Sequence, residues 1–407
     1  MRETRAVITG LGVVSPAGRG NEEYFGNLLK GKSILREITR FDASRYPARH
    51  AGLVDNLDSG GLFSKRLIKK LDRFSEMALV ATDDALKDAG LDIDAEDKDR
   101  VGIILGNALG GWSFAEVELR DLYQTGVREV SPYQATAWFP AAPQGQVSIH
   151  YGIKGFAKTI ISDIASSHLA VSYAARAVVA GKADVVVAGG TEAPISPYAL
   201  LCCNSSGELS TAGKYRPFDR RRDGYVIGEG AGILIVEGYE RAKARGAKIY
   251  AEIKGFGHTS DGADPVNPDV SGDGLARAMR AALSESGSTA RDIDYLMPSG
   301  NGGRLYDASE SNALTGVFGD SLNDVMAGVP KALYGNLLGA SGALDMVTAC
   351  LAMERGQAPT YTGCNEPEDN CRWAEGSGGK VNKEIGRVMI NSTGRGGVNT
   401  CVVLAKP

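Results

Sequence analysis

The sequence predicts an α/β fold with buried sheets, and three features indicate it. Short apolar, β-branched runs lie beside clusters of glycine, a pattern typical of buried strands. Helical stretches separate these runs, and strands that alternate with helices are typical of α/β proteins. The segment AVITGLGVVS near the N-terminus also resembles YAEIKGFGHTS at 250–260, which predicts two similar halves, 1–250 and 251–407, in one compact body.

Each predicted strand is an apolar run of three to five residues that is too short to be a helix. In chain order these runs are 6–9, 101–105, 185–188, 233–236, 388–390 and 401–404. The longer stretches between them are predicted helices, at 65–89, 168–180 and 273–286. Glycine clusters such as GNALGG at 106–111 and GEGAG at 228–232 mark the turns.

Composition excludes several classes of function. The 407 residues carry a formal net charge of −4, with acids and bases spread along the chain, so neither nucleic acid nor an anionic membrane is an expected partner. No apolar run reaches the ~18 to 20 residues of a membrane span, and the N-terminus lacks the pattern of a signal peptide, so we expect a cytoplasmic protein. The six cysteines and four histidines form no recognisable metal motif.

Five segments carry a family resemblance when they are taken together and in order. They are VITGLGVVSPAG at 7–18, ADVVVAGGTEAPISP at 183–197, PFDRRRDGYVIGEGAGILIVE at 217–237, ERAKARGAKIYAEIKGFG at 240–257 and NSTGRGGVNTCVVL at 391–404. The set resembles the β-ketoacyl synthases of the thiolase-like superfamily along nearly the whole chain. This resemblance implies the thiolase fold, with five αβαβα layers and duplicated halves, in a dimer.

The resemblance also shows that the expected catalytic groups are missing. An active ketosynthase uses a cysteine nucleophile at the start of a buried helix, together with two histidines that assist decarboxylation and stabilise the oxyanion. The matching positions in this chain are Ile164 in SDIASSH, Ser299 in MPSGNGG and Asn336 in LYGNLLG. None of these side chains can accept an acyl group as a thiolate does. We therefore expect a catalytically inactive subunit.

Other parts of the same motifs are retained or changed. The lysine of the second histidine motif is kept as Lys331, and a carboxylate that follows it is kept as Asp345. The phenylalanine of the family's C-terminal GFGG turn is replaced by Arg395. Two candidates for substitute catalysts are His168, one helical turn after Ile164, and the Cys202–Cys203 pair. For both, packing in the core is the favoured interpretation.

Two further segments resemble one branch of the family. They are GNALGGWSFAEVELRDLYQTG at 106–126 and SPYQATAWFPAAPQGQVSIHYGIKG at 131–155. Both are similar to the chain length factor, or ketosynthase β subunit, of a type II polyketide synthase. The resemblance implies a heterodimer with a catalytic ketosynthase α subunit. It also implies acyl chains delivered on the phosphopantetheine of an acyl carrier protein, and no cofactor bound by this chain.

A predicted helix at 112–123 would carry the determinant of chain length. Helical spacing places Trp112, Ala115, Leu119 and Leu122 on one side. In chain length factors the positions matching Trp112, Ala115 and Leu119 act as gates at the end of the polyketide tunnel. The other interpretation is that this stripe packs a core or a plain dimer interface.

Two alternative functions remain open from the sequence. One is an active β-ketoacyl-ACP synthase or malonyl-ACP decarboxylase with atypical active-site residues. The other is a thiolase-fold protein that binds an acyl ligand outside polyketide synthesis. Many chain length factors of aromatic pathways carry glutamine where this chain has Ile164, so a priming role is in doubt.

Overall fold

The computed structural model describes residues 4–55, 57, 59, 61–374 and 380–407. Ten main strands form one continuous sheet in two sets of five. The first set is, in spatial order, β1 (Ala6–Ser15), β9 (Gly230–Gly238), β7 (Val185–Glu192), β5 (Val101–Gly106) and β6 (Ala157–Ile160). The second is β10 (Ala251–Ser260), β16 (Val398–Ala405), β15 (Arg387–Gly394), β11 (Tyr295–Met297) and β12 (Met326–Ala327). Each predicted strand lies within one of these elements.

The two sets of strands have the same topology. In each, the first two pairs of neighbouring strands are antiparallel and the last two pairs are parallel. In each, the first strand in the chain lies at the junction and the last lies next to it. The sets meet where β1 pairs with β10, the two strands that carry the similar segments noted in the sequence. The predicted boundary at residue 250 falls directly before β10.

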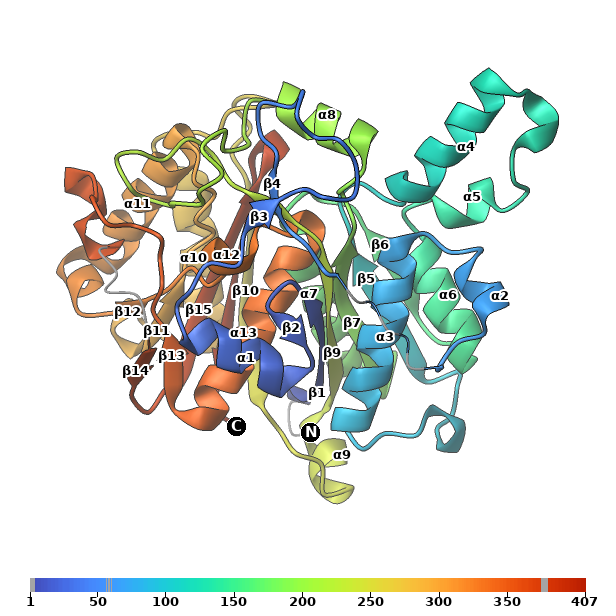
Figure 1. The fold of residues 1–407 in the computed structure, drawn as a ribbon. Helices are drawn as coiled ribbons and strands as arrows, with labels where there is room; N and C mark the ends of the chain where they lie inside the picture. Colours follow the sequence, from blue (N-terminus) through green and yellow to red (C-terminus); the bar gives the residue numbers. More distant parts are fainter. Residues whose placement is uncertain (1–3, 56, 58, 60, 375–379) are drawn as a thin grey trace.

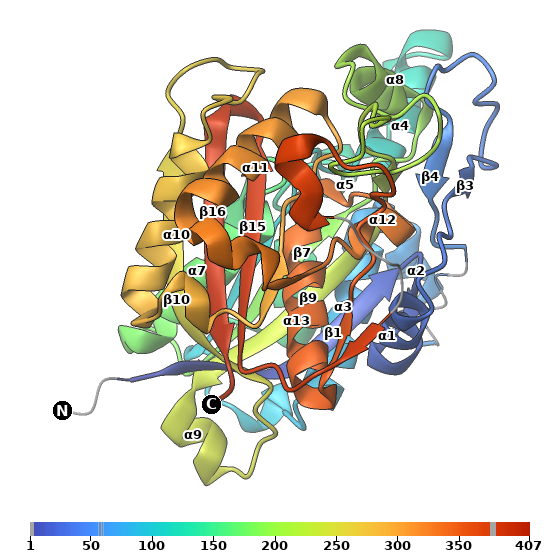
Figure 2. The same cartoon turned by 90° about the vertical axis from the view of Figure 1, so that its left-hand side faces the viewer.

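Helices complete five layers, which Figure 1 shows almost edge-on. Helices α3 (Arg73–Asp88) and α6 (Ala142–Tyr151) cover the outer face of the first set of strands, and α10 (Asp273–Ser286) and α11 (Arg304–Phe318) cover that of the second. Helices α7 (Ser166–Val179) and α13 (Ser341–Arg355) lie between the two sets and contact both. Figure 2 shows α10 and α11 in front of β15 and β16. The predicted α/β fold with five αβαβα layers is confirmed.

Close packing around the central helix α7 requires glycine at two contacts. A Cβ atom at Gly342 of α13 would lie 2.3 Å from Cδ2 of His168 on α7. A Cβ at Gly106, at the end of β5, would likewise lie 2.6 Å from the carbonyl carbon of Ser166. Real Cβ atoms do not approach other atoms so closely, so these glycines let α7 pack directly against its neighbours.

One predicted helix is wrong in extent. The stretch 65–89 is not continuous but forms α2 (Lys65–Ile68) and α3, because the chain is extended at Asp72. The Asp72 carboxylate caps α3 by accepting a hydrogen bond from the Phe74 N–H (3.1 Å). It also accepts one from the Phe114 N–H (2.7 Å) at the start of α4, so one side chain fixes the beginnings of two helices. Burial raises the pKa of Asp72 to about 6.

The remaining elements are short and lie mostly at the rims of the sheets. They are β2 (Gly18–Arg19), α1 (Asn21–Leu29), β3 (Arg36–Glu37), β4 (His50–Gly52), α4 (Trp112–Gln124), α5 (Gln134–Ala137), α8 (Pro197–Ser205), β8 (Ile227–Gly228), α9 (Tyr239–Ala244), α12 (Lys331–Tyr334), β13 (Gln357–Pro359) and β14 (Lys380–Asn382). The 3-10 turns are η1 (Ile93–Ala95), η2 (Val127–Glu129), η3 (Ala290–Asp292), η4 (Gly319–Asn323), η5 (Leu338–Ala340), η6 (Asp369–Ala374) and η7 (Arg395–Gly397). Helices α4 and α5 form a lobe, residues 112–139, that stands out from the body in Figure 1. Within the part of the chain that the structure describes, no helix combines the length and the apolar character needed to cross a membrane.

Candidate functional site

Ile164 lies in the tight turn that leads into α7, and its side chain is only 4% exposed. The Ser166 hydroxyl accepts a hydrogen bond from the Ser162 N–H (2.8 Å) and donates one to the Asp163 carbonyl (2.6 Å). Asp163 itself adopts a positive φ of 49°. The turn thus presents residue 164 at the N-terminus of a buried helix, where a thiolate would be stabilised, but the side chain there is aliphatic.

Ser299 follows β11 and is fully engaged in structural hydrogen bonds. Its N–H donates to the Glu310 carboxylate (2.8 Å), and its hydroxyl accepts from the Thr393 N–H (3.1 Å). Its carbonyl oxygen accepts from the Lys331 ammonium (3.2 Å). The side chain is 2% exposed, so Ser299 ties β11 to β15 rather than facing an open site.

Asn336 is also buried and also has a local structural role. Its side-chain oxygen accepts hydrogen bonds from the Leu338 N–H (2.9 Å) and from the Ser341 hydroxyl (2.8 Å). Its main chain forms a bridge with Ile227. The amide therefore holds the turn that leads into α13, and its oxygen already has two donors.

The retained lysine and carboxylate form a buried ion pair beside these positions. The Lys331 Nζ lies 2.5 Å from Oδ2 of Asp345, and both side chains are buried. Burial raises the pKa of Asp345, and the ammonium of Lys331 acts in the opposite direction. The same ammonium donates to the Ser299 carbonyl, so the pair supports the position that a catalytic histidine would occupy.

Short chains of contacts connect the three predicted positions. Thr393 bonds Ser299, and two residues later the Arg395 N–H donates to the Asp163 carboxylate (2.7 Å), next to Ile164. Leu338, whose N–H bonds Asn336, lines one small cavity together with Ile164. The positions inferred from the resemblance therefore belong to one region of the molecule.

The cavity at Ile164 is too small for a substrate. Its volume is about 40 Å³, close to the ~30 Å³ that one water molecule occupies in the liquid. Pockets for small molecules usually measure ~300 to 1,000 Å³. It is lined by Leu109, Asp163, Ile164, Cys203, Glu208, Tyr225, Asn301, Tyr306, Leu338, Gly394 and Arg395.

Two buried carboxylates with raised pKa values were missed by sequence reasoning. Glu192 accepts hydrogen bonds from the N–H groups of Ala108 (2.6 Å), Leu109 (3.1 Å) and Gly339 (3.1 Å), and burial raises its pKa to about 8. Burial likewise raises the pKa of Asp307 to about 7. An acid directly after the apolar run ADVVVAGGT was the available signal for Glu192. Through its three hydrogen bonds, the Glu192 carboxylate joins the loop after β5 to the turn before α13.

Of the candidate substitute catalysts, His168 and Cys203 are both buried. His168 is fully buried between the sheets, where its Nδ1 lies 2.9 Å from the Thr400 hydroxyl. Burial lowers its pKa to about 3. Cys203 is also buried, which raises the pKa of its thiol to about 12, whereas Cys202 is exposed on α8. These positions agree with a packing role for His168 and Cys203.

The predicted helix at 112–123 is present as α4, with Trp112 as its first residue. Ala115 is buried, whereas Leu119 is 38% exposed. The Trp112 ring packs against Tyr198 of α8, with centroids 4.8 Å apart, and lies 6.5 Å from the Trp138 ring. None of the three predicted gate residues lines a cavity described within this chain.

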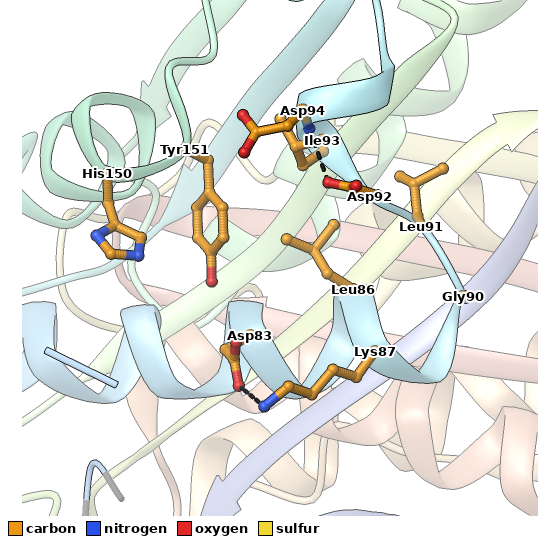
Figure 3. Close-up of a pocket in the computed structure, with 10 residues that line it drawn as sticks. All are labelled: Asp83, Leu86, Lys87, Gly90, Leu91, Asp92, Ile93, Asp94, His150 and Tyr151. Atoms are coloured by element: carbon orange, nitrogen blue, oxygen red, sulfur yellow. Dashed lines mark hydrogen bonds and ion pairs between the residues drawn. The ribbon is translucent and has the colours of Figure 1, made fainter. Parts of the chain in front are cut away.

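Another side of α4 borders a hollow of about 370 Å³ next to Arg40 and Phe41. Two arginines at this hollow, Arg40 and Arg73, contact the fully buried Glu229. A larger hollow, of about 500 Å³, lies between the end of α3 and the end of α6. Figure 3 shows Tyr151 directed into it and Asp83 paired with Lys87. None of the predicted site residues lines either hollow.

Among the described residues, no group of three or more histidine, cysteine, aspartate or glutamate side chains is arranged to hold a metal ion. Ile164, Ser299 and Asn336 are all buried, and none of their side chains is ionisable at neutral pH.

Comparison with known proteins identifies the family. The chain matches the beta-ketoacyl synthase N-terminal domain over residues 3–242 and the beta-ketoacyl synthase C-terminal domain over residues 250–365. It is 35% identical over 406 residues to a 3-oxoacyl-(acyl-carrier-protein) synthase 2 of Staphylococcus aureus (strain COL), covering 99% of this chain and 98% of the relative.

Two solved structures are similar over the whole chain. The ishigamide ketosynthase/chain length factor superimposes with a TM-score of 0.93 at 30% identity and covers 100% of both chains. A type II polyketide synthase acyl-carrier protein in complex with its ketosynthase bound to the hexaketide gives a TM-score of 0.90 at 26% identity, again over 100% of both. Since both domains of the family match in order and the relatives align end to end, the chain belongs to the β-ketoacyl synthase family.

Proposed function

We propose that this chain is a chain length factor of a type II polyketide synthase. It pairs with an active ketosynthase α subunit, completes the tunnel that holds the growing polyketide, and limits the length of the product. The acyl chain arrives on the phosphopantetheine of an acyl carrier protein and is held on the partner's cysteine.

The observation that carries this proposal is the filled site around Ile164. The nucleophile position is an aliphatic side chain, and the cavity beside it holds about 40 Å³. The Ser299 hydroxyl and the Asn336 side-chain oxygen are both engaged in structural hydrogen bonds. A fold kept intact around a site without a nucleophile favours a role in shaping the partner's tunnel.

The surface of the α4–α5 lobe supports a partner subunit. Large apolar side chains are exposed along it: Val117, Leu119, Tyr123, Val127, Tyr133, Trp138 and Phe139. Tyr123 is 83% and Phe139 54% exposed. Apolar patches of this kind usually mark an interface. Ile161, directly after the edge strand β6, is exposed as well.

The alternative is an active β-ketoacyl-ACP synthase or malonyl-ACP decarboxylase with atypical residues. The relative from Staphylococcus aureus is named as a synthase and is 35% identical over the full length, which favours this alternative. Such an enzyme would require a nucleophile near residue 164. The cysteine that lines the small cavity is Cys203, and burial raises the pKa of its thiol to about 12, which keeps it protonated.

Reconstitution separates the two functions. This chain, carrying the affinity tag, is co-expressed with a candidate ketosynthase and an acyl carrier protein, and the purified material is assayed with malonyl-loaded carrier. A one-to-one complex that condenses, with acyl mass found on the partner alone, supports the chain length factor. Acyl mass on this chain, or condensation by this chain without a partner, supports the alternative. Ile164→Ala serves as a matched control, because it should leave the location of the acyl group unchanged.

A further inference from the structure

A further hollow lies next to the small cavity at Ile164, on its outer side. It measures about 480 Å³ and is lined by Ser206, Gly207, Glu208, Arg221, Arg222, Asp223, Gly224, Val266, Asn267, Gly303, Arg304, Leu305 and Tyr306. Glu208 and Tyr306 line both spaces, whereas Ile164 and Arg395 line the inner one alone. Glu208 and Tyr306 therefore form the boundary between the outer hollow and position 164.

An ion pair lies on this boundary. The Arg395 guanidinium donates two hydrogen bonds to the Glu208 carboxylate, Nε to Oε1 at 3.0 Å and Nη2 to Oε2 at 2.7 Å. This is the bidentate geometry in which arginine–carboxylate pairs are strongest. The two residues are 187 positions apart in the sequence, so the pair joins the β15–β16 turn to the loop after α8.

Both partners are held in place by their backbones. The N–H of Arg395 donates to the Asp163 carboxylate (2.7 Å), which anchors the turn to the residue before Ile164. The carbonyl oxygen of Glu208 accepts from the Tyr225 N–H (3.0 Å), and Tyr225 is buried against the same cavity. The pair is thus anchored from two sides.

We infer that the Arg395–Glu208 pair closes the passage from the surface to position 164, and so excludes an acyl-pantetheine arm from this subunit. The inference rests on the proposed function only in naming the excluded group. Its consequence is selectivity: a carrier protein that reaches the complex can deliver its acyl chain only through the partner. Arg395 is a specificity-determining residue in this sense, because it touches neither substrate nor reacting atoms.

Access to position 164 can be measured as the rate at which a thiol placed there is alkylated. Ile164→Cys places a thiol in the inner cavity, and the exposed Cys202 provides an internal reference on the same chain. Bromoacetyl-pantetheine is the long probe and iodoacetamide the short one. In each reaction the thiolate sulfur forms a thioether bond to the probe's methylene carbon and halide leaves, so peptide mass spectrometry gives the rate at each thiol.

With Arg395 intact, we expect the long probe to label the reporter at least about tenfold more slowly than Cys202, since opening the passage breaks two charge-assisted hydrogen bonds. Arg395→Ala in the reporter background should raise the reporter rate by about tenfold or more. Glu208→Gln, which keeps the shape of the side chain and removes its charge, should also raise the rate at which the reporter thiol is labelled. The charge-reversed double variant R395E/E208R should restore slow labelling. Arg221 lines the outer hollow and pairs with Asp219, so Arg221→Ala is the matched arginine control. It should leave the labelling rate of the reporter thiol unchanged.

Rapid labelling of the reporter by the long probe with Arg395 in place would overturn the inference. So would an unchanged rate in both Arg395→Ala and Glu208→Gln. If Arg395→Ala fails to fold by circular dichroism, Glu208→Gln and the charge-reversed variant decide the outcome. The assay needs neither a partner nor condensation, so its failure is distinct from failure of the proposed function.

Discussion

The ammonium of Lys331 and the carboxylate of Asp345 lie 2.5 Å apart in the centre of the molecule, where neither is accessible to water. The pair connects α12 to α13 and also reaches the Ser299 carbonyl. In an active synthase such groups would lie beside a catalytic histidine. In this chain they hold together the segments on either side of the filled site.

Removal of one partner should therefore destabilise the fold. Lys331→Met leaves the Asp345 carboxyl buried without its cation, which should lower the free energy of unfolding by ~3–5 kcal/mol. Urea denaturation measures this change. The double variant K331M/D345L should recover most of the loss, because no charge is left unpaired. Lys98→Met, which removes a surface pair with Asp94, is the control and should lower the free energy of unfolding much less. An equal cost at the two lysines would contradict the prediction.

Trp112→Gly should shift the products of the reconstituted complex toward longer chains. The change removes an indole ring that packs on Tyr198 at the start of α4, and it opens roughly the space of one aromatic side chain. Mass spectrometry of released products checks the result. Tyr123→Ala removes an aromatic ring from the exposed end of the same helix and should leave product length unchanged. If both variants give the parent product, Trp112 is not a gate.

Ile164→Cys alone should not create a condensing enzyme. The new thiol would lie at the N-terminus of α7, but Ser299 and Asn336 would still occupy the positions of the two histidines. The cavity beside it would remain far smaller than an acyl chain requires. The test is condensation by the variant without a partner, using malonyl-loaded carrier and an acyl donor. Turnover above that of the parent chain would mean that the missing groups are supplied by residues not assigned here.

His168 should make stability depend on pH. Burial lowers its pKa from 6.5 to about 3, so the unfolded chain binds a proton in a pH range where the folded chain does not. Stability from this group is complete above pH 6.5 and is lost as the pH falls toward 3. The free energy of unfolding should drop by up to ~1.4 kcal/mol per pH unit in that window. His168→Asn should flatten this slope, whereas the exposed His150→Asn should not. An unchanged slope in H168N would contradict the assignment.

Local sequence patterns predicted six of the ten main strands, together with α4 and α10, because glycine clusters and apolar runs act over a few residues. The break before α3 was missed, since it depends on Asp72 capping its own helix while bonding Phe114, 42 positions away. The Arg395–Glu208 pair could not be predicted, because the resemblance shows that a phenylalanine is replaced but not what the arginine contacts. The small volume of the cavity at Ile164 likewise depends on residues from seven separate parts of the chain.

The lobe of α4 and α5 also has a consequence for how the cell must make this protein. A chain that presents Tyr123, Val127 and Phe139 to water remains prone to aggregation until another surface covers them. Under the proposed pairing with a ketosynthase, any surplus of this chain over its partner would keep these side chains exposed and would be removed by precipitation or proteolysis. The two subunits should therefore be synthesised in matched amounts and close in time. The ratio of their translation rates would then limit how much synthase assembles.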